Sequence, residues 1–121
     1  MKSQQPAGKL AHPAVSLVIT VHNGAEFVTE SIEDARRFLE NRCPEYEIVI
    51  VDDGSTDGTA AAVDPLLGSR TRLISLPENL GKFAALRAGM AEATGECRVF
   101  TDADLPYDLE AVPYIVSLIR E

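Results

Sequence analysis

Two clusters of carboxylates follow short apolar runs and are the residues best suited to chemistry. Asp52 and Asp53 end one run, and Asp102 and Asp104 follow another. Two carboxylates on either side of a small residue can approach one hard divalent cation. Mg²⁺ or Mn²⁺ held in this way takes its remaining oxygen ligands from water and a diphosphate. The pattern therefore predicts a site for a metal ion and a phosphorylated ligand.

Turn formation is the alternative explanation for either cluster alone, because Asp, Gly and Ser are common after strands. Both clusters at one edge of a sheet favour function. Asp57 is assigned to helix capping rather than to the site. His22, as a lone histidine, receives no metal or acid/base role. Lys82 is either part of a solvated helix face or, because it opens a helix after Gly81, a partner for phosphate.

The elements that position these residues alternate between apolar runs and amphipathic segments. The expected strands span residues 15–21, 48–51, 72–76 and 97–101, and the expected helices span 25–41, about 55–67, 82–93 and 109–119. This order favours an α/β fold with a mostly parallel sheet and helices on both faces. Because the carboxyl ends of parallel strands share one edge, the polar residues that follow three of the strands should converge there.

Two local expectations concern the helices after the second and third strands. Ser55 or Thr56 is expected to cap the first of these helices, with Asp57 in its first turn. The second is expected to end at a cap formed by Gly95 and to bury an apolar stripe that begins with Phe83. The remaining members of the expected stripe are Leu86, Met90 and Ala93.

Composition limits the class of protein. The chain has 121 residues, of which 45% are hydrophobic and 25% charged, as expected for one domain. Its formal net charge is −8 and no basic stripe is visible, so nucleic acid is not an expected partner. The two cysteines suggest reduced structural thiols. Residues 1–14 are expected to be a flexible lead-in, and without an apolar run of about 18 residues the chain is expected to be cytoplasmic.

Four motifs, taken in order, resemble the family 2 glycosyltransferases, which have a Rossmann-like GT-A fold. They lie at residues 15–23, 48–59, 79–82 and 101–107, and the resemblance covers about residues 15–119. The run Gly-Lys-x-x-Ala-x-Arg-x-Gly-Met at 81–90, followed by Asp-Ala-Asp, is most similar to a subgroup of enzymes. These enzymes transfer a sugar from a nucleotide diphosphate to a polyprenyl or dolichyl phosphate, and their full-length forms would act at the inner face of a membrane.

The resemblance implies a role for each matching residue. The implied donor nucleotide-binding residues are Thr20, His22, Asn23, Asp52, Asp53 and Lys82. Among them, Asp53 falls where a carboxylate recognises the base, and Lys82 falls near the donor phosphates. Asp102 and Asp104 match the metal-binding triplet for Mg²⁺ or Mn²⁺, with Asp104 the more direct ligand.

The sequence departs from the family pattern at three places. His22-Asn23-Gly24 replaces the usual Tyr-Asn-Glu, which alters the aromatic stacking and removes an acid. Phe83 replaces a glycine after Lys82. Pro106 stands where mannosyl-phosphate synthases often place a glutamine, which weakens a mannose assignment and leaves glucose or another hexose open.

The length of the chain suggests the donor-binding half of such an enzyme, over residues 15–121. Family members need a second half that supplies the acceptor site and, in inverting enzymes, the general base. No residue of this chain is therefore assigned as catalytic. Truncation also predicts an exposed apolar face and self-association through it. The alternative from another class is a non-catalytic nucleotide-binding or interaction module derived from this fold.

Overall fold

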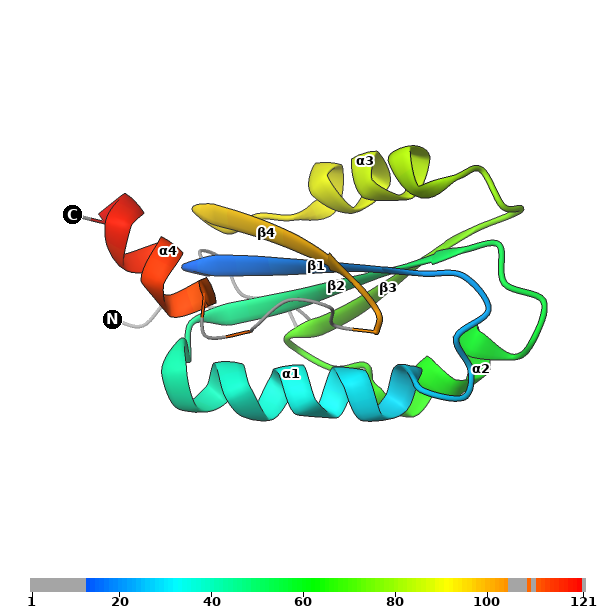
Figure 1. Cartoon of the computed structure of the whole chain (residues 1–121), viewed down its shortest axis with the longest axis horizontal. Coiled ribbons are helices and arrows are strands. Elements are labelled where there is room, and N and C mark those ends of the chain that lie inside the picture. Colours follow the sequence, from blue (N-terminus) through cyan, green and yellow to red (C-terminus); the bar gives the residue numbers. More distant parts are fainter. Residues whose placement is uncertain (1–12, 105–108, 110, 121) are drawn as a thin grey trace.

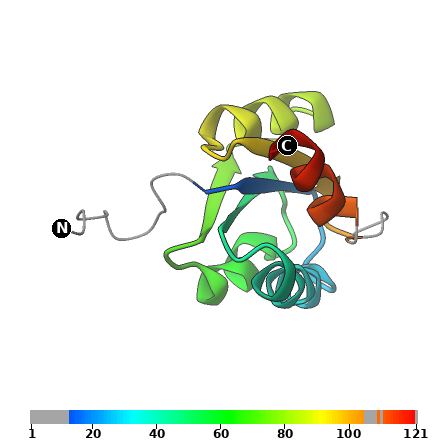
Figure 2. The same cartoon turned by 90° about the vertical axis from the view of Figure 1, so that its left-hand side faces the viewer.

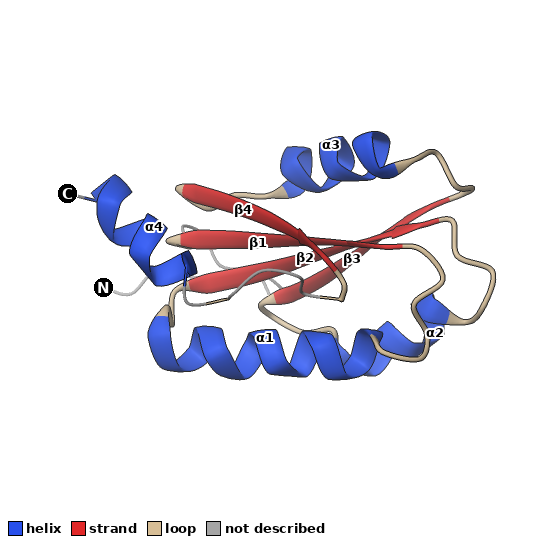
Figure 3. Ribbon diagram, viewed as in Figure 1, coloured by secondary structure: helices blue, strands red, loops and turns tan. Residues whose placement is uncertain are grey.

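The computed structural model describes residues 13–104, 109 and 111–120, which form one layered α/β unit. The predicted lead-in at residues 1–14 lies almost wholly outside the described residues, as does Pro106. In chain order the elements are β1 (Val15–Val21), α1 (Val28–Arg42), β2 (Tyr46–Asp53), α2 (Thr59–Val63), a 3₁₀ turn (Asp64–Leu66), β3 (Thr71–Leu76), α3 (Lys82–Glu92), β4 (Cys97–Asp102) and α4 (Ala111–Arg120) (Figure 3).

The sheet has four strands in the order β3-β2-β1-β4, and all three pairings are parallel. Helices α1 and α2 lie on one face and α3 lies on the other (Figure 1), and the view along the strands shows the sheet between them (Figure 2). The predicted α/β architecture with helices on both faces is confirmed.

Burial explains why the first two strands are the most apolar. β1 and β2 are central, and every residue in both is buried. β3 and β4 form the sheet edges and are only partly buried. The pairing register places Thr20 opposite Asp102 and Val21 opposite Asp52. The polar residues at the carboxyl ends of three strands therefore share one edge of the sheet, as predicted.

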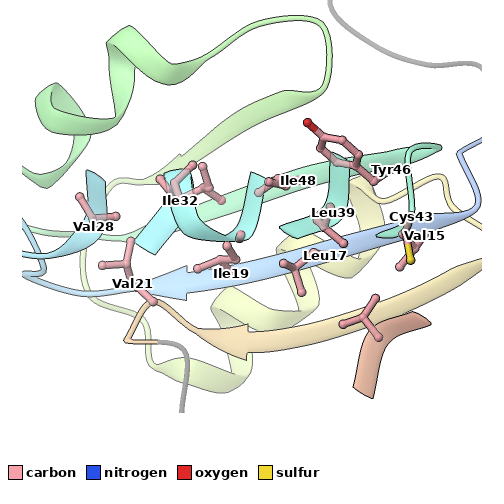
Figure 4. Close-up of a cluster of buried hydrophobic side chains, with 14 of the residues drawn as sticks. Val15, Leu17, Ile19, Val21, Val28, Ile32, Leu39, Cys43, Tyr46 and Ile48 are labelled. Atoms are coloured by element: carbon pink, nitrogen blue, oxygen red, sulfur yellow. The ribbon is translucent and has the colours of Figure 1, made fainter. Parts of the chain in front are cut away.

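Side chains on the two faces of the sheet build two separate cores. On the α1 face, residues of β1 such as Leu17 and Ile19 pack with Ile32 and Leu39 of α1 (Figure 4). On the α3 face, the core contains Val18, Val49 and Val51 from the strands and Ala85 and Ala93 from the α3 region. Both cores include side chains of the two central strands, so these strands anchor the helices on both faces of the sheet.

β2 is longer than the predicted strand at residues 48–51, because it includes Tyr46 and Glu47 before that run and Asp52 and Asp53 after it. Pairing with the neighbouring strands explains the difference. Tyr46 pairs with Val15 of β1, and Asp53 pairs with Leu76 of β3. The polar ends of β2 are thus held in the sheet by backbone pairing.

The helix after β2 begins later than predicted. Its N-cap is Gly58, at φ 91°, and neither Ser55 nor Thr56 caps it. Asp57 precedes the helix, yet it does serve the helix start, because its Oδ1 accepts the Thr59 N–H at 3.1 Å and the Thr59 hydroxyl at 2.5 Å. These bonds, chiefly the one from the hydroxyl, lower the pKa of the Asp57 carboxyl.

The predicted apolar stripe of α3 is wrong at Phe83 but is borne out at its other members, because Leu86 and Met90 are partly buried against the core on this face and Ala93 is buried. Phe83 is 77% exposed, whereas Ala85 and Gly89 are the buried residues of α3. A Cβ at Gly89 would lie 2.4 Å from Cγ1 of Val18, so α3 packs closer to the sheet than bulky side chains allow. The C-cap is Ala93 rather than Gly95, and Gly95 instead donates its N–H to the Ser16 hydroxyl at 2.8 Å.

Both cysteines are free and buried, as the sequence predicts. Burial raises the pKa of the Cys43 and Cys97 thiols, so they remain protonated near neutral pH. Among the helices that the structure describes, none is long and apolar enough to cross a membrane.

Candidate functional site

A cleft of about 470 Å³ opens at the carboxyl ends of the strands, beside the start of α3. Of the eight residues predicted for the site, six line this cleft: Thr20, His22, Asp53, Lys82, Asp102 and Asp104. The other two, Asn23 and Asp52, are not among the described residues that line it. The structure therefore brings together most of the predicted site, from β1, β2, α3 and the end of β4.

The two adjacent aspartates of β2 point to opposite faces of the sheet, because successive side chains of a strand alternate. Asp53 lies on the α3 face, toward the cleft, and Asp52 lies on the α1 face. Asp52 Oδ1 accepts the N–H of Ser55 at 3.1 Å, so its carboxylate holds the turn after β2. Only Asp53 of this pair reaches the cleft.

The Asp53 carboxylate fixes the turn that leads into α3. One oxygen accepts the Leu80 N–H at 2.8 Å and the other accepts the Gly81 N–H at 3.1 Å. Asp53 is only 5% exposed, so these bonds are shielded from water. A carboxylate has about four lone-pair sites, so capacity for a ligand remains. Base recognition by Asp53 stays a prediction, whereas its hold on the start of α3 is a property of the structure.

Gly54 lets the turn before α3 lie directly on the end of β2. It has φ 65°, and a Cβ there would lie 2.2 Å from the carbonyl carbon of Glu78 and 2.3 Å from the Asn79 nitrogen. Backbone atoms cannot yield as a flexible side chain can. The position therefore requires glycine both for its backbone angle and for space.

We expect Gly54→Ala to lower the free energy of unfolding by about 2–3 kcal/mol, from backbone strain and overlap with the turn. Urea unfolding followed by circular dichroism measures the change. Gly58→Ala is the matched control, because Gly58 also has positive φ, at 91°, but a Cβ at that position would meet no atom within 4 Å. Equal losses in the two variants would show that overlap with the turn contributes nothing.

Asn23 ties the loops after β1 and β2 together. It has φ 54°, the left-handed conformation that Asn tolerates. Its Oδ1 accepts the Thr56 N–H at 2.8 Å, and its own N–H donates to the Ser55 hydroxyl at 2.7 Å. Asn23 thus holds together the two loops at the rim of the cleft without lining the cleft itself.

Thr20, Lys82 and Asp102 form a hydrogen-bonded polar group that lines the cleft. Lys82 Nζ lies 2.6 Å from a carboxylate oxygen of Asp102, and the Thr20 hydroxyl donates to Asp102 Oδ1 at 3.2 Å. Gly81 and Lys82 also begin α3, whose first N–H groups have no acceptor within the helix. A cation and a helix N-terminus therefore meet at one point, an arrangement that suits phosphate.

The donor set fits a hard divalent cation. Asp102 and Asp104 both line the cleft, Asp104 is exposed, and both offer carboxylate oxygens. Among the described residues, no group of three or more His, Cys, Asp and Glu side chains is placed to hold a metal. Mg²⁺ is usually held by one or two carboxylates together with substrate phosphates, so two carboxylates suffice when a diphosphate supplies the rest.

Two residues of the cleft go beyond those predicted from the sequence. Asn79 Nδ2 lies 3.2 Å from His22 Nε2, and Phe27 lines the cleft while being 40% exposed. Asn79 has a signal in the sequence, since it opens the Asn-Leu-Gly-Lys motif. Phe27 falls inside the helix expected at residues 25–41, but α1 begins only at Val28, and Phe27, which precedes it, lines the cleft.

Comparison with known proteins identifies the family of the chain. Residues 16–121 match the model of glycosyl transferase family 2. The chain therefore belongs to glycosyl transferase family 2, a family of transferases. This confirms the resemblance drawn from the four motifs.

A curated relative extends the comparison. The prophage bactoprenol glucosyl transferase homolog of Escherichia coli (strain K12) is 35% identical over 105 residues, which cover 85% of this chain and 34% of that protein. The chain thus spans about a third of the length of this relative.

Solved structures agree on the fold. A mannosyltransferase from Pyrobaculum calidifontis, in complex with GDP-Man and Mn²⁺, matches with a TM-score of 0.69 and 30% identity, over 93% of this chain and 36% of that one. Glucosyl-3-phosphoglycerate synthase from Mycobacterium tuberculosis, in complex with UDP, matches with a TM-score of 0.67 and 26% identity, over 90% of this chain and 41% of that one.

Proposed function

We propose that residues 15–121 bind a nucleoside diphosphate hexose together with a divalent metal, as the donor-binding part of a glycosyltransferase that acts on a polyprenyl phosphate. The observation that carries the proposal is the convergence of Asp102, Asp104 and Lys82 with the N-terminus of α3 in one cleft. These groups supply metal ligands, a cation and N–H donors. A diphosphate is the ligand that uses all three.

The charge of the cleft explains why a metal is part of the proposal. Asp53, Asp102 and Asp104 line it together with one cation, Lys82, among the described residues. Phosphate would be repelled from such a site unless further positive charge accompanied it. Asp102 and Asp104 would hold Mg²⁺ or Mn²⁺, which supplies stabilisation of the negative charge on the departing nucleoside diphosphate.

The residues of the chain bind and orient the donor in this proposal. Lys82 and the first turn of α3 hold the phosphates, and Thr20 aligns Asp102 through its hydroxyl. The nucleoside extends along the loop rim that contains His22 and Asp53, as the family resemblance implies. Asn23 and Asp52 act on this rim indirectly, by fixing the loops that carry it.

The donor and acceptor classes rest on the relatives. The E. coli relative is named as a bactoprenol glucosyl transferase homolog, which supports a polyprenyl phosphate acceptor at a membrane surface. The complexes with UDP and with GDP-Man support a nucleoside diphosphate sugar of either base. We assign no general base to the described residues.

Isothermal titration calorimetry of the chain with UDP-glucose and GDP-mannose, each with and without MnCl₂, tests the proposal. We expect one of the two sugars to bind with 1:1 stoichiometry, and binding to weaken strongly when the metal is removed. Absence of binding for both donors and for UDP and GDP, with metal present, would contradict the proposal and favour an interaction module.

We also propose that the chain self-associates through exposed apolar side chains of α3 and β4. Phe83 of α3 is 77% exposed and Phe100 of β4 is 54% exposed, and Leu86 lies beside Phe100. Burying such side chains on association is favourable. Light scattering should give a mass above that of the monomer at high concentration, and the Phe83→Ser, Phe100→Ser double variant should lower it. A monomeric mass for the unaltered chain at all concentrations would contradict this expectation.

A further inference from the structure

His22 lies at the meeting point of three loops, and its hydrogen bonds define its protonation state. Nδ1 is 2.8 Å from the backbone carbonyl oxygen of Asp53. A carbonyl oxygen can only accept, so Nδ1 must carry the hydrogen. This bond joins the loop after β1 to the end of β2.

The other ring nitrogen faces two amide groups. Nε2 lies 3.2 Å from Asn79 Nδ2 and 3.3 Å from Asn23 Nδ2. The orientation of each amide is fixed by its oxygen, because Asn79 Oδ1 accepts the Gly81 N–H at 3.1 Å and Asn23 Oδ1 accepts the Thr56 N–H at 2.8 Å. Both amides therefore present N–H donors, and Nε2 must accept. The geometry requires a neutral imidazole.

These bonds close a ring, which we call the His22 ring, through His22, Asp53, Gly81 and Asn79. His22 donates to the Asp53 carbonyl, the Asp53 carboxylate accepts from Gly81, Gly81 also donates to Asn79, and Asn79 donates back to His22. Gly81 is the residue before Lys82, so the ring fixes the start of α3 at the cleft.

We propose that His22 is a positioning residue of the donor site that acts only as the neutral Nδ1–H tautomer. Protonation places an N–H at Nε2 against the amide donors of Asn79 and Asn23, which opens the His22 ring at Asn79. The turn that carries Gly81 and Lys82 then loosens, and donor binding weakens on acidification. The effect on donor binding rests on the proposed function, whereas the ring itself does not.

Charged side chains also lie near the cleft, but among the described residues none is hydrogen-bonded to Nε2 of His22. Those that line the cleft are Asp53, Lys82, Asp102 and Asp104, and Glu78 lies in the turn before α3. The Asp53 carboxylate is directed to Leu80 and Gly81, and the Asp102 carboxylate to Lys82. The direct partners of Nε2 remain the two amides.

A ligand-free NMR titration tests the ring. The chain has two histidines, so His12→Gln leaves the signals of His22 alone. At pH 7.5, ¹⁵N shifts should show Nδ1 protonated and Nε2 unprotonated. Between pH 7.5 and 5.5 the amide signals of Leu80 and Gly81 should move with the same midpoint as His22. An Nε2–H tautomer, or amide signals of Leu80 and Gly81 that do not shift as His22 titrates, would overturn the proposal.

Two variants distinguish a positioning role of His22 in the donor site from a role in stabilising the fold alone. His22→Asn keeps an N–H for the Asp53 carbonyl but cannot titrate. Asn79→Asp keeps the acceptor for Gly81 but presents a carboxylate oxygen to Nε2, so that protonated His22 closes the ring instead of opening it. A residue that merely supports the fold would not give these two variants different responses to pH.

Affinity for UDP-glucose and GDP-mannose with Mn²⁺, measured by calorimetry at pH 7.5 and 5.5, gives the readout. Nucleoside diphosphate sugars have no terminal phosphate that titrates in this range. The unaltered chain should lose about threefold to tenfold in affinity on acidification, as expected for one or two neutral hydrogen bonds. His22→Asn should lose less than twofold, and Asn79→Asp should not weaken. The same loss of affinity on acidification in all three proteins would overturn the proposal. Absence of donor binding at both pH values would reject the proposed function, and the NMR titration alone would then test whether the His22 ring exists.

Discussion

Replacing Asp104 by asparagine is expected to lower the affinity of the chain for a nucleoside diphosphate sugar with Mn²⁺ by about 100-fold. Loss of an outer partner of a metal site costs about 10–100-fold, and we expect loss of a direct ligand to cost at least as much as the larger of these effects. Asp104 is the ligand with the larger expected effect, because it is exposed and no hydrogen bond to another described residue is seen for it. Asp102 is already engaged by Lys82 and Thr20.

Calorimetry with and without metal separates the role of Asp104 as a ligand from its charge. Asp104→Asn should remove most of the metal dependence and leave the weak metal-free binding nearly unchanged. Glu78→Gln is the matched control, since it removes one exposed carboxylate near the start of α3 that the proposal does not use. If Asp104→Asn retains full metal-dependent affinity, the assignment of the metal ligand is wrong.

The largest expected effect on stability lies away from the cleft, at Glu47. This side chain is 1% exposed, at the start of β2, and it accepts hydrogen bonds from three partners. Its partners are the Ser16 hydroxyl at 2.6 Å, the Thr94 N–H at 2.7 Å and Arg72 Nη2 at 2.7 Å. A fully bonded carboxylate therefore joins β1, β2, β3 and the segment after α3.

Glu47→Gln is expected to lower the free energy of unfolding by about 3–5 kcal/mol, the cost of breaking a buried ion pair from one side. The amide cannot accept at both positions, and Arg72 loses its buried counter-charge. Urea unfolding measures the loss. Glu92→Gln is the matched control, because Glu92 pairs with the same Arg72 while being 55% exposed, and its loss should stay below about 1 kcal/mol.

The pH dependence of stability gives a second readout for Glu47. Burial acts to raise the pKa of its carboxyl, but hydrogen bonds from Ser16, Thr94 and Arg72 outweigh burial, so the pKa lies below its ordinary value. The unfolded chain then binds the proton more readily than the folded chain. The stabilisation is therefore present above about pH 4.3 and is lost as pH falls through the lowered folded value.

Unfolding curves between pH 7 and 3 should show this loss in the unaltered chain and a shallower slope in Glu47→Gln. An equal slope in both proteins, or a loss at pH 7 no larger than that of Glu92→Gln, would show that the Glu47 bonds contribute little to folding.

Strand positions followed from the sequence because burial on both faces requires apolar runs. β1 begins and ends where the pattern predicts, and the convergence of polar residues at one edge followed from parallel strand direction alone. The packing of α3 followed only in part. Leu86, Met90 and Ala93 pack on the sheet as predicted, whereas the burial of Gly89 and the exposure of Phe83 depend on how closely the helix approaches the sheet. Helical periodicity carries no information on that distance.

The sequence predicted the chemical character of the site better than the role of each residue in it. The residue types of Asp102, Asp104 and Lys82 indicated metal and phosphate. The separation of Asp52 from Asp53 follows from strand alternation only once the strand is known to continue through both residues. The role of Glu47 was hidden, since its partners lie up to 47 residues away along the chain.

Paramagnetic broadening by Mn²⁺ tests the central claim most directly. In a ¹H–¹⁵N spectrum of the chain with UDP-glucose or GDP-mannose, substoichiometric Mn²⁺ should first remove the amide signals of Ala103 and Asp104, followed by those of Thr20 and Lys82. Signals around the second polar cleft, near Glu40 and Arg70, should persist. Broadening centred on that second cleft, or none near Ala103 and Asp104 with either sugar nucleotide present, would contradict a metal-dependent donor site at this edge of the sheet.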